Sequence, residues 1–63
     1  MQITLKAARH NKGLKQIEMA KALHVSKKTI GAWENGKALP KADKIDEICQ
    51  LLEVSYDNIK WTV

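Results

Sequence analysis

The chain has 63 residues, 44% of them hydrophobic, with one cysteine, one proline and a formal net charge of +4 at pH 7. This length accommodates one small domain, near the lower limit at which an apolar core holds a fold without disulfides or metal. We therefore expect a single domain over residues 1–63. Because the one cysteine cannot form an internal disulfide, we expect a reducing cytoplasm. Because the sequence contains neither a membrane-spanning apolar run nor a signal-peptide pattern, we expect no membrane contact.

Apolar spacing predicts five short helices, three of them in the N-terminal half. Thr4 is placed to cap the first helix, and Gly13 ends it where a left-handed backbone costs little. The second helix extends from about Lys15 or Gln16 to Leu23. The third begins after the capping residue Ser26 and continues to about residue 35, with Gly36 as its stop.

Two further helices are predicted in the C-terminal half. Pro40 opens or directly precedes the fourth helix. The inward stripe of that helix consists of Ile45, Ile48, Cys49 and Leu52. A short fifth helix follows Ser55 and includes Ile59. Residues 23–30 and 52–59 share the pattern Leu-x-Val-Ser-x-x-x-Ile. In each, the serine (Ser26 or Ser55) is placed to cap a helix, and the Val and Ile have the spacing of a hydrophobic staple.

Charge is distributed unevenly along the chain. Residues 1–41 carry nine basic and two acidic side chains, whereas residues 42–63 carry two basic and five acidic ones. This asymmetry gives one half of a small protein a positive field, which is typical of proteins that bind polyanions. The alternative is a solvated, lysine-rich surface.

The third helix has an unusual outward face. At 100° per residue its apolar residues Ile30 and Trp33 point inward. The opposite face consists of Lys27, Lys28, Gly31, Ala32 and Asn35. A glycine there costs ~1 kcal/mol relative to alanine, and two lysines in the first turn oppose the helix dipole by roughly 0.3–1 kcal/mol each. The residues on this outward face therefore make the third helix less stable than ordinary exposed helix residues would.

A helix lying in the major groove of DNA would account for this face. Lys27 and Lys28 can donate to guanine O6 and N7 or to phosphates. Gly31 lets the backbone approach the bases, and the Ala32 methyl can contact a thymine methyl. The alternatives are a solvated lysine surface and tolerated drift at the glycine.

The sequence does not indicate enzymatic chemistry. His10 and His24 have no partners at metal-ligand spacing, and Cys49 lies on an inward stripe as a small apolar filler. Neither an activated nucleophile nor a glycine-rich phosphate loop is visible. We therefore expect no enzyme, no metal, no cofactor and no small-molecule substrate.

Residues 15–37, "KQIEMAKALHVSKKTIGAWENGK", resemble the helix-turn-helix of the phage repressor and Cro (XRE) family. "LKAARHNKGL" resembles the family's first helix, and "LPKADKIDEICQLLEVSYDNI" its fourth and fifth. The departures are His24 and Glu53, where the family usually has a helix-ending glycine, and Ala8, which is often larger. The resemblance implies an all-α, compact five-helix lambda-repressor-like domain with its helix-turn-helix at about 16–35.

The resemblance also implies roles for individual residues. The positions that read bases match Lys27, Lys28, Gly31 and Ala32. The residues expected at DNA phosphates are Gln16, Asn35 and Lys37, with Lys15 as a weaker candidate. Arg9 and Glu34 match an ion pair that links the first and third helices, and we expect this pair to be structural.

The function indicated is sequence-specific binding of double-stranded DNA by a transcriptional regulator, a Cro-like repressor of phage type in a bacterial or phage-infected cell. A single reading helix covers few base pairs, so we expect a homodimer on a palindromic operator with half-sites ~34 Å apart. The expected self-association surface is Tyr56, Asn58 and Trp61, although Trp61 packed on the first helix is an equal alternative. The rival function is a protein-interaction module on the same fold, an antitoxin or antirepressor that works through its acidic half and Trp61.

Overall fold

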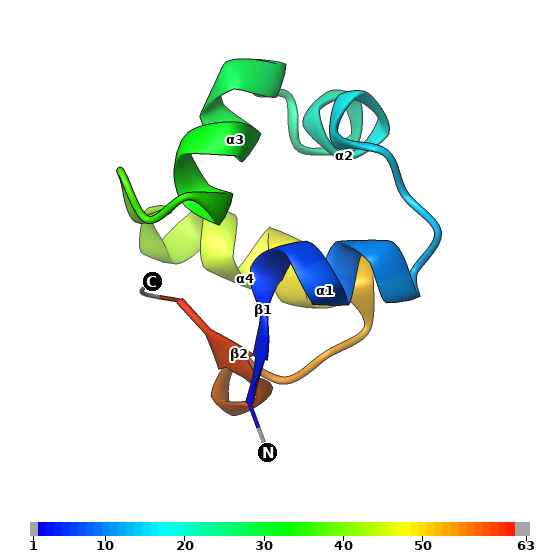
Figure 1. Ribbon diagram of the computed structural model, residues 1–63, viewed down its shortest axis with the longest axis vertical. Coiled ribbons are helices and arrows are strands. Elements are labelled where there is room, and N and C mark those ends of the chain that lie inside the picture. Colours follow the sequence, from blue (N-terminus) through cyan, green and yellow to red (C-terminus); the bar gives the residue numbers. More distant parts are fainter. Residues whose placement is uncertain (1, 62–63) are drawn as a thin grey trace.

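Four α-helices and one pair of short strands make up residues 2–61, which the computed structural model describes (Figure 1). The helices are α1 (Leu5–Asn11), α2 (Gln16–Leu23), α3 (Lys27–Glu34) and α4 (Ala42–Leu52). The strands are β1 (Ile3–Thr4) and β2 (Ile59–Lys60), and the 3-10 turn η1 (Tyr56–Asn58) precedes β2. None of these helices is long and apolar enough to cross a membrane.

Hydroxyl caps start two of the helices where the sequence predicts them. The Thr4 hydroxyl accepts a hydrogen bond from the Ala7 amide at 3.0 Å. The Ser26 hydroxyl accepts one from the Thr29 amide at 3.1 Å. Both predictions are confirmed. Ser55 precedes η1 but makes no capping hydrogen bond through its side chain, so the predicted third cap is wrong.

The mostly helical architecture is confirmed, but the count of five helices is not. The described residues after Ser55 form one 3-10 turn, and Ile59 is already extended, with φ −106° and ψ 132°. Aspartate and asparagine, as at Asp57 and Asn58, have low helix propensity because their side chains favour non-helical backbone conformations, which disfavours propagation beyond one turn. The extended segment pairs in parallel with β1 in the register Ile3 to Ile59. The Ile59 side chain is thereby buried in the core.

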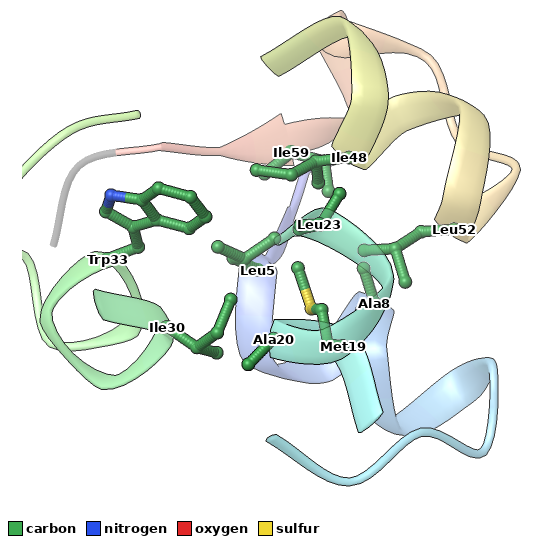
Figure 2. Packing of buried hydrophobic residues seen from close by; sticks show 10 residues of the cluster. All are labelled: Leu5, Ala8, Met19, Ala20, Leu23, Ile30, Trp33, Ile48, Leu52 and Ile59. Carbon is green, nitrogen blue, oxygen red and sulfur yellow. The ribbon is translucent and has the colours of Figure 1, made fainter. Parts of the chain in front are cut away.

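One cluster of ten buried apolar residues joins all four helices and β2 (Figure 2). It consists of Leu5, Ala8, Met19, Ala20, Leu23, Ile30, Trp33, Ile48, Leu52 and Ile59. The predicted inward stripe of α4 is therefore correct at Ile48 and Leu52. Ile45 and Cys49 are only half-buried, at the edge of this stripe. Burial and the nearby Asp46 charge raise the pKa of the Cys49 thiol.

Two helices end on residues with a left-handed backbone that are not glycine. His24 follows α2 with φ 57°, and Glu53 follows α4 with φ 55°. A residue with a Cβ pays roughly 1–2 kcal/mol for this conformation. Both departures from the family pattern therefore occupy positions where glycine would be less strained.

Replacing His24 by glycine is expected to raise the free energy of unfolding by about 0.5–1 kcal/mol. The left-handed strain disappears, and the larger entropy of unfolded glycine offsets part of the gain. Urea denaturation followed by circular dichroism measures the change. His10→Gly is the matched control, because His10 is exposed within α1, and it should lose a few tenths of a kcal/mol, roughly the difference in helix propensity between histidine and glycine. A loss at both positions would contradict the strain argument.

Candidate nucleic-acid interface

The position of α3 is fixed from its inward side. Ile30 and Trp33 are 0% and 7% exposed, and both point into the core cluster (Figure 2). A short turn joins α3 to α2, and within it the Val25 amide donates to the Ala20 carbonyl at 3.0 Å. The opposite face of α3 therefore points away from the core.

That outward face forms one side of an open groove of about 440 Å³. The residues that line it are Gln16, Lys27, Lys28, Gly31, Ala32, Asn35 and Lys37. The groove thus brings together all four predicted base-reading residues. It also contains three of the four residues predicted at phosphates, whereas Lys15 does not line it.

The groove is basic, and two of the residues that line it, Gly31 and Ala32, have very small side chains. Lys27, Lys28 and Lys37 are exposed, and none of the described residues that line the groove is acidic. Apart from its chain neighbours and the backbone of its own helix, Gly31 has no atom within 4 Å of the position that a Cβ would take. A polyanion can therefore approach the backbone of α3 between lysines, without steric or electrostatic opposition from the groove.

A buried ion pair connects α3 to the rest of the domain. Arg9 Nε donates to Glu34 Oε2 at 2.6 Å, and the side chains of Arg9 and Glu34 are 6% and 2% exposed. A second guanidinium nitrogen of Arg9 donates to Glu34 Oε1 at 3.2 Å, and the third donates to the Leu14 carbonyl at 2.8 Å. Glu34, which ends α3, is therefore turned away from the groove and held by α1.

Gln16 belongs both to this buried network and to the groove. Its side-chain nitrogen donates to Glu34 Oε1 at 3.0 Å. An amide nitrogen carries two N–H groups, so one remains for another acceptor. The network thus fixes the direction of a polar side chain at the edge of the groove, with one donor left over.

The same contacts set the pKa of Glu34. Burial by itself raises the pKa, but the hydrogen bonds from Arg9 and Gln16, together with the Arg9 charge, bring it below the ordinary 4.5. Because the folded value is the lower one, the carboxylate contributes stability that is fully present above pH 4.5. This contribution is lost as the pH falls through the lowered value.

We expect the Glu34 carboxyl carbon to titrate in NMR with a midpoint below pH 4.5, and the free energy of unfolding to decrease as the pH falls below that value. In a Gln16→Ala variant the midpoint should move upward, since one hydrogen bond to the charged form is lost. A wild-type midpoint above 4.5 would mean that desolvation of the carboxylate outweighs its bonds.

Comparison with known proteins identifies the family. The model of the helix-turn-helix family matches residues 5–59, which include the groove and its buried ion pair. This chain belongs to the helix-turn-helix family. The family is of the DNA-binding regulator type and is not typically enzymatic.

Two curated relatives share this helix-turn-helix segment. The ImmF control region 10 kDa protein of Bacillus phage phi105 is 38% identical over 58 residues, which are 92% of this chain and 64% of the relative. The antitoxin PezA of Streptococcus pneumoniae serotype 4 is 34% identical over 55 residues, which are 87% of this chain and 35% of the relative. This chain therefore spans less than two thirds of either relative. No solved structure matches it with comparable significance.

Lys44 also contacts the helix-turn-helix, although its position in the sequence did not predict this. Its Nζ donates to the Leu23 carbonyl at 2.7 Å and lies 3.3 Å from Glu47 Oε2. A lysine at the C-terminal end of a helix satisfies a free carbonyl and complements the helix dipole. Lys44 therefore supports the turn between α2 and α3. Because it lies on α4, no local sequence signal reveals this contact.

The residues predicted for self-association lie outside the groove of this helix-turn-helix domain. The Tyr56 and Trp61 rings are stacked, with centroids 5.7 Å apart, and Trp61 Nε1 donates to the Tyr56 carbonyl at 3.1 Å. Tyr56 and Asn58 are exposed, whereas Trp61 is half-buried against the core cluster. Trp61 is therefore partly accessible for self-association and partly packed against the core.

Proposed function

We propose that this chain is a transcriptional regulator, a repressor of the Cro-like phage type, that reads double-stranded DNA with α3 in the major groove. The observation that carries the proposal is the single basic groove that gathers Lys27, Lys28, Gly31 and Ala32 on α3. The relationship to a phage control-region protein supports a regulatory role.

The residues of the protein groove have different proposed roles in DNA binding. Lys27 and Lys28 contact base edges, while the small side chains of Gly31 and Ala32 allow the backbone of α3 to approach the bases in the major groove of DNA. Gln16, Asn35 and Lys37 contact phosphates and fix the register, with Lys15 adding a peripheral charge. The Arg9 to Glu34 pair supports this arrangement from the core side.

We also propose that two copies bind the half-sites of a palindromic operator. Adjacent half-sites lie ~34 Å apart, and the domain measures 28 × 23 × 20 Å between its outermost Cα atoms. Two copies therefore fit side by side. Self-association through Tyr56, Asn58 and Trp61 leaves the groove free, since that patch shares no residue with it.

The second candidate function is a protein-interaction module, which the relationship to an antitoxin favours. A gel-shift competition against a pool of random duplexes separates the two functions. The regulator should enrich a palindromic sequence, and Lys27→Ala or Lys28→Ala should weaken binding to it by ~1–3 kcal/mol. No enrichment would favour the protein-interaction module, and an equal loss on every sequence would reduce that lysine to a phosphate contact.

Gly31→Ala is expected to separate folding from DNA binding. The added methyl group meets open space in the free protein, so the helix should gain ~1 kcal/mol of stability. Affinity for the enriched duplex should fall at the same time, because the methyl group keeps the backbone from the base edges. Thermal denaturation and gel shifts measure the two effects. A stabilised variant with unchanged affinity would refute the clearance role of this glycine.

A further inference from the structure

The base-reading part of the groove offers hydrogen-bond donors only. Lys27 and Lys28 carry ammonium groups, which have three donors and no acceptor. Gly31 and Ala32 contribute no polar side-chain atom. The carboxylate of α3, Glu34, is 2% exposed, and its oxygens accept from Arg9 and Gln16. No carboxylate among the described lining residues is therefore available to accept from a base.

The hydroxyl groups at the start of α3 are also engaged. Ser26 Oγ accepts from the Thr29 amide, and the Ser26 and Thr29 hydroxyls lie 2.9 Å apart in a hydrogen bond. Hydroxyl groups are the side-chain groups that contact several bases with little discrimination. Because part of the hydrogen-bonding capacity of these two hydroxyl groups is used in the helix cap, we assign selection at the leading end of α3 to the two lysines.

Guanine is the base that matches such a surface. Its major-groove edge presents two acceptors, N7 and O6, and no donor, whereas adenine combines its N7 acceptor with an amino donor, cytosine presents an amino donor only, and thymine presents a single acceptor, O4. Along the helix axis Lys27 and Lys28 are only ~1.5 Å apart, but their side chains point about 100° apart around the helix. Two long lysine side chains that diverge in this way can reach two adjacent base pairs, which are ~3.4 Å apart along one DNA strand.

The rest of the reading face is apolar. Ala32 lies four residues beyond Lys28, slightly more than one helical turn or ~6 Å along the axis. This distance corresponds to roughly one or two base-pair steps. A methyl group facing the major groove is matched by the C5-methyl group of thymine, and Gly31 leaves room for the approach.

We propose that the groove selects half-sites in which two adjacent guanines are followed, one or two base pairs further, by a thymine. The inference rests on the proposed DNA-binding function and names the DNA that the function requires. It assigns base selection to Lys27, Lys28 and Ala32, with guanine preferred over the other three bases at the two lysine positions.

Selection from a pool of random duplexes, followed by sequencing, tests the inference with the wild type and Lys28→Gln. The wild type should enrich the guanine pair. A glutamine pairs with adenine N6 and N7, so the variant should exchange one G·C pair for A·T and bind the wild-type duplex about 5- to 150-fold more weakly. Lys60→Gln, an exposed change in β2 outside the groove, should keep the wild-type preference.

Base analogues in the enriched duplex test the individual contacts. Uracil in place of the thymine removes one methyl group and should weaken binding about fourfold. 7-Deazaguanine at either guanine removes the N7 acceptor and should also weaken binding of the wild type. 7-Deazaadenine at the adenine that Lys28→Gln selects should weaken binding of that variant, because the glutamine then loses the N7 acceptor. An enriched palindrome without adjacent guanines would overturn this inference and leave the proposed function standing. No enrichment of any sequence would overturn both.

Discussion

Arg9→Met is expected to lower the free energy of unfolding by about 3–5 kcal/mol, because it leaves a buried carboxylate without its charge partner. The Glu34 side chain is 2% exposed, so water cannot replace the guanidinium. The Leu14 carbonyl also loses a donor. This loss is a large fraction of the 5–15 kcal/mol that is typical of a folded domain. Urea denaturation monitored by circular dichroism measures it.

The chain contains a matched control for this substitution. Lys12→Met breaks the ion pair with Glu53, but these side chains are 37% and 71% exposed. Exposed pairs contribute roughly 0–1 kcal/mol, so the control should remain close to the wild type. A double variant, Arg9→Met with Glu34→Leu, should recover much of the loss, since no charge is then buried alone. Equal losses in both single variants would contradict the role of burial.

DNA affinity is expected to fall steeply with salt. If Lys15 and Lys37 each neutralise one phosphate in both protomers, four counterions are released. The logarithm of the binding constant should then decrease by about 3.6 per tenfold increase in salt. Between about 50 and 200 mM salt this amounts to roughly a 100-fold loss of affinity. Titrations of a labelled duplex by fluorescence anisotropy at several salt concentrations measure the slope.

Lys37→Gln should reduce this slope by about 2 in a dimer, one for each copy, and weaken binding to all sequences alike. The matched control is Lys60→Gln, because Lys60 does not line the groove. A slope that is flat in the wild type would contradict a basic reading face. A slope that Lys37→Gln leaves unchanged would remove this residue from the phosphate contacts.

Local signals explain why much of the helix-turn-helix could be predicted. Thr4 and Ser26 cap the helices that follow them, and such caps act within three residues. The helical wheel of α3 depends only on its fixed angle per residue, and it predicted that Ile30 and Trp33 point into the core. The groove collects the outward face of the same wheel. The DNA-binding roles of these residues stay predictions.

The features that escaped prediction depend on contacts between distant segments. Strands of two residues, such as β1 and β2, are too short to show a period in the sequence. The bond from Lys44 to Leu23 joins helices that are not neighbours in sequence. Cys49 was expected inside the core, but the orientation of α4 leaves it at the edge. Each of these outcomes is set by how the helices pack together.

The parallel pairing of β1 with β2 has a consequence for how this domain folds. It joins Ile3 to Ile59, nearly the full described chain apart, whereas α2 and α3 are neighbours in sequence. Closing a long loop costs more chain entropy than closing a short one. We therefore expect the strand pair to form after the helices have assembled and to open before them in local unfolding. Exchange of the amide hydrogens at the two ends would then report these openings while the helix-turn-helix stays protected.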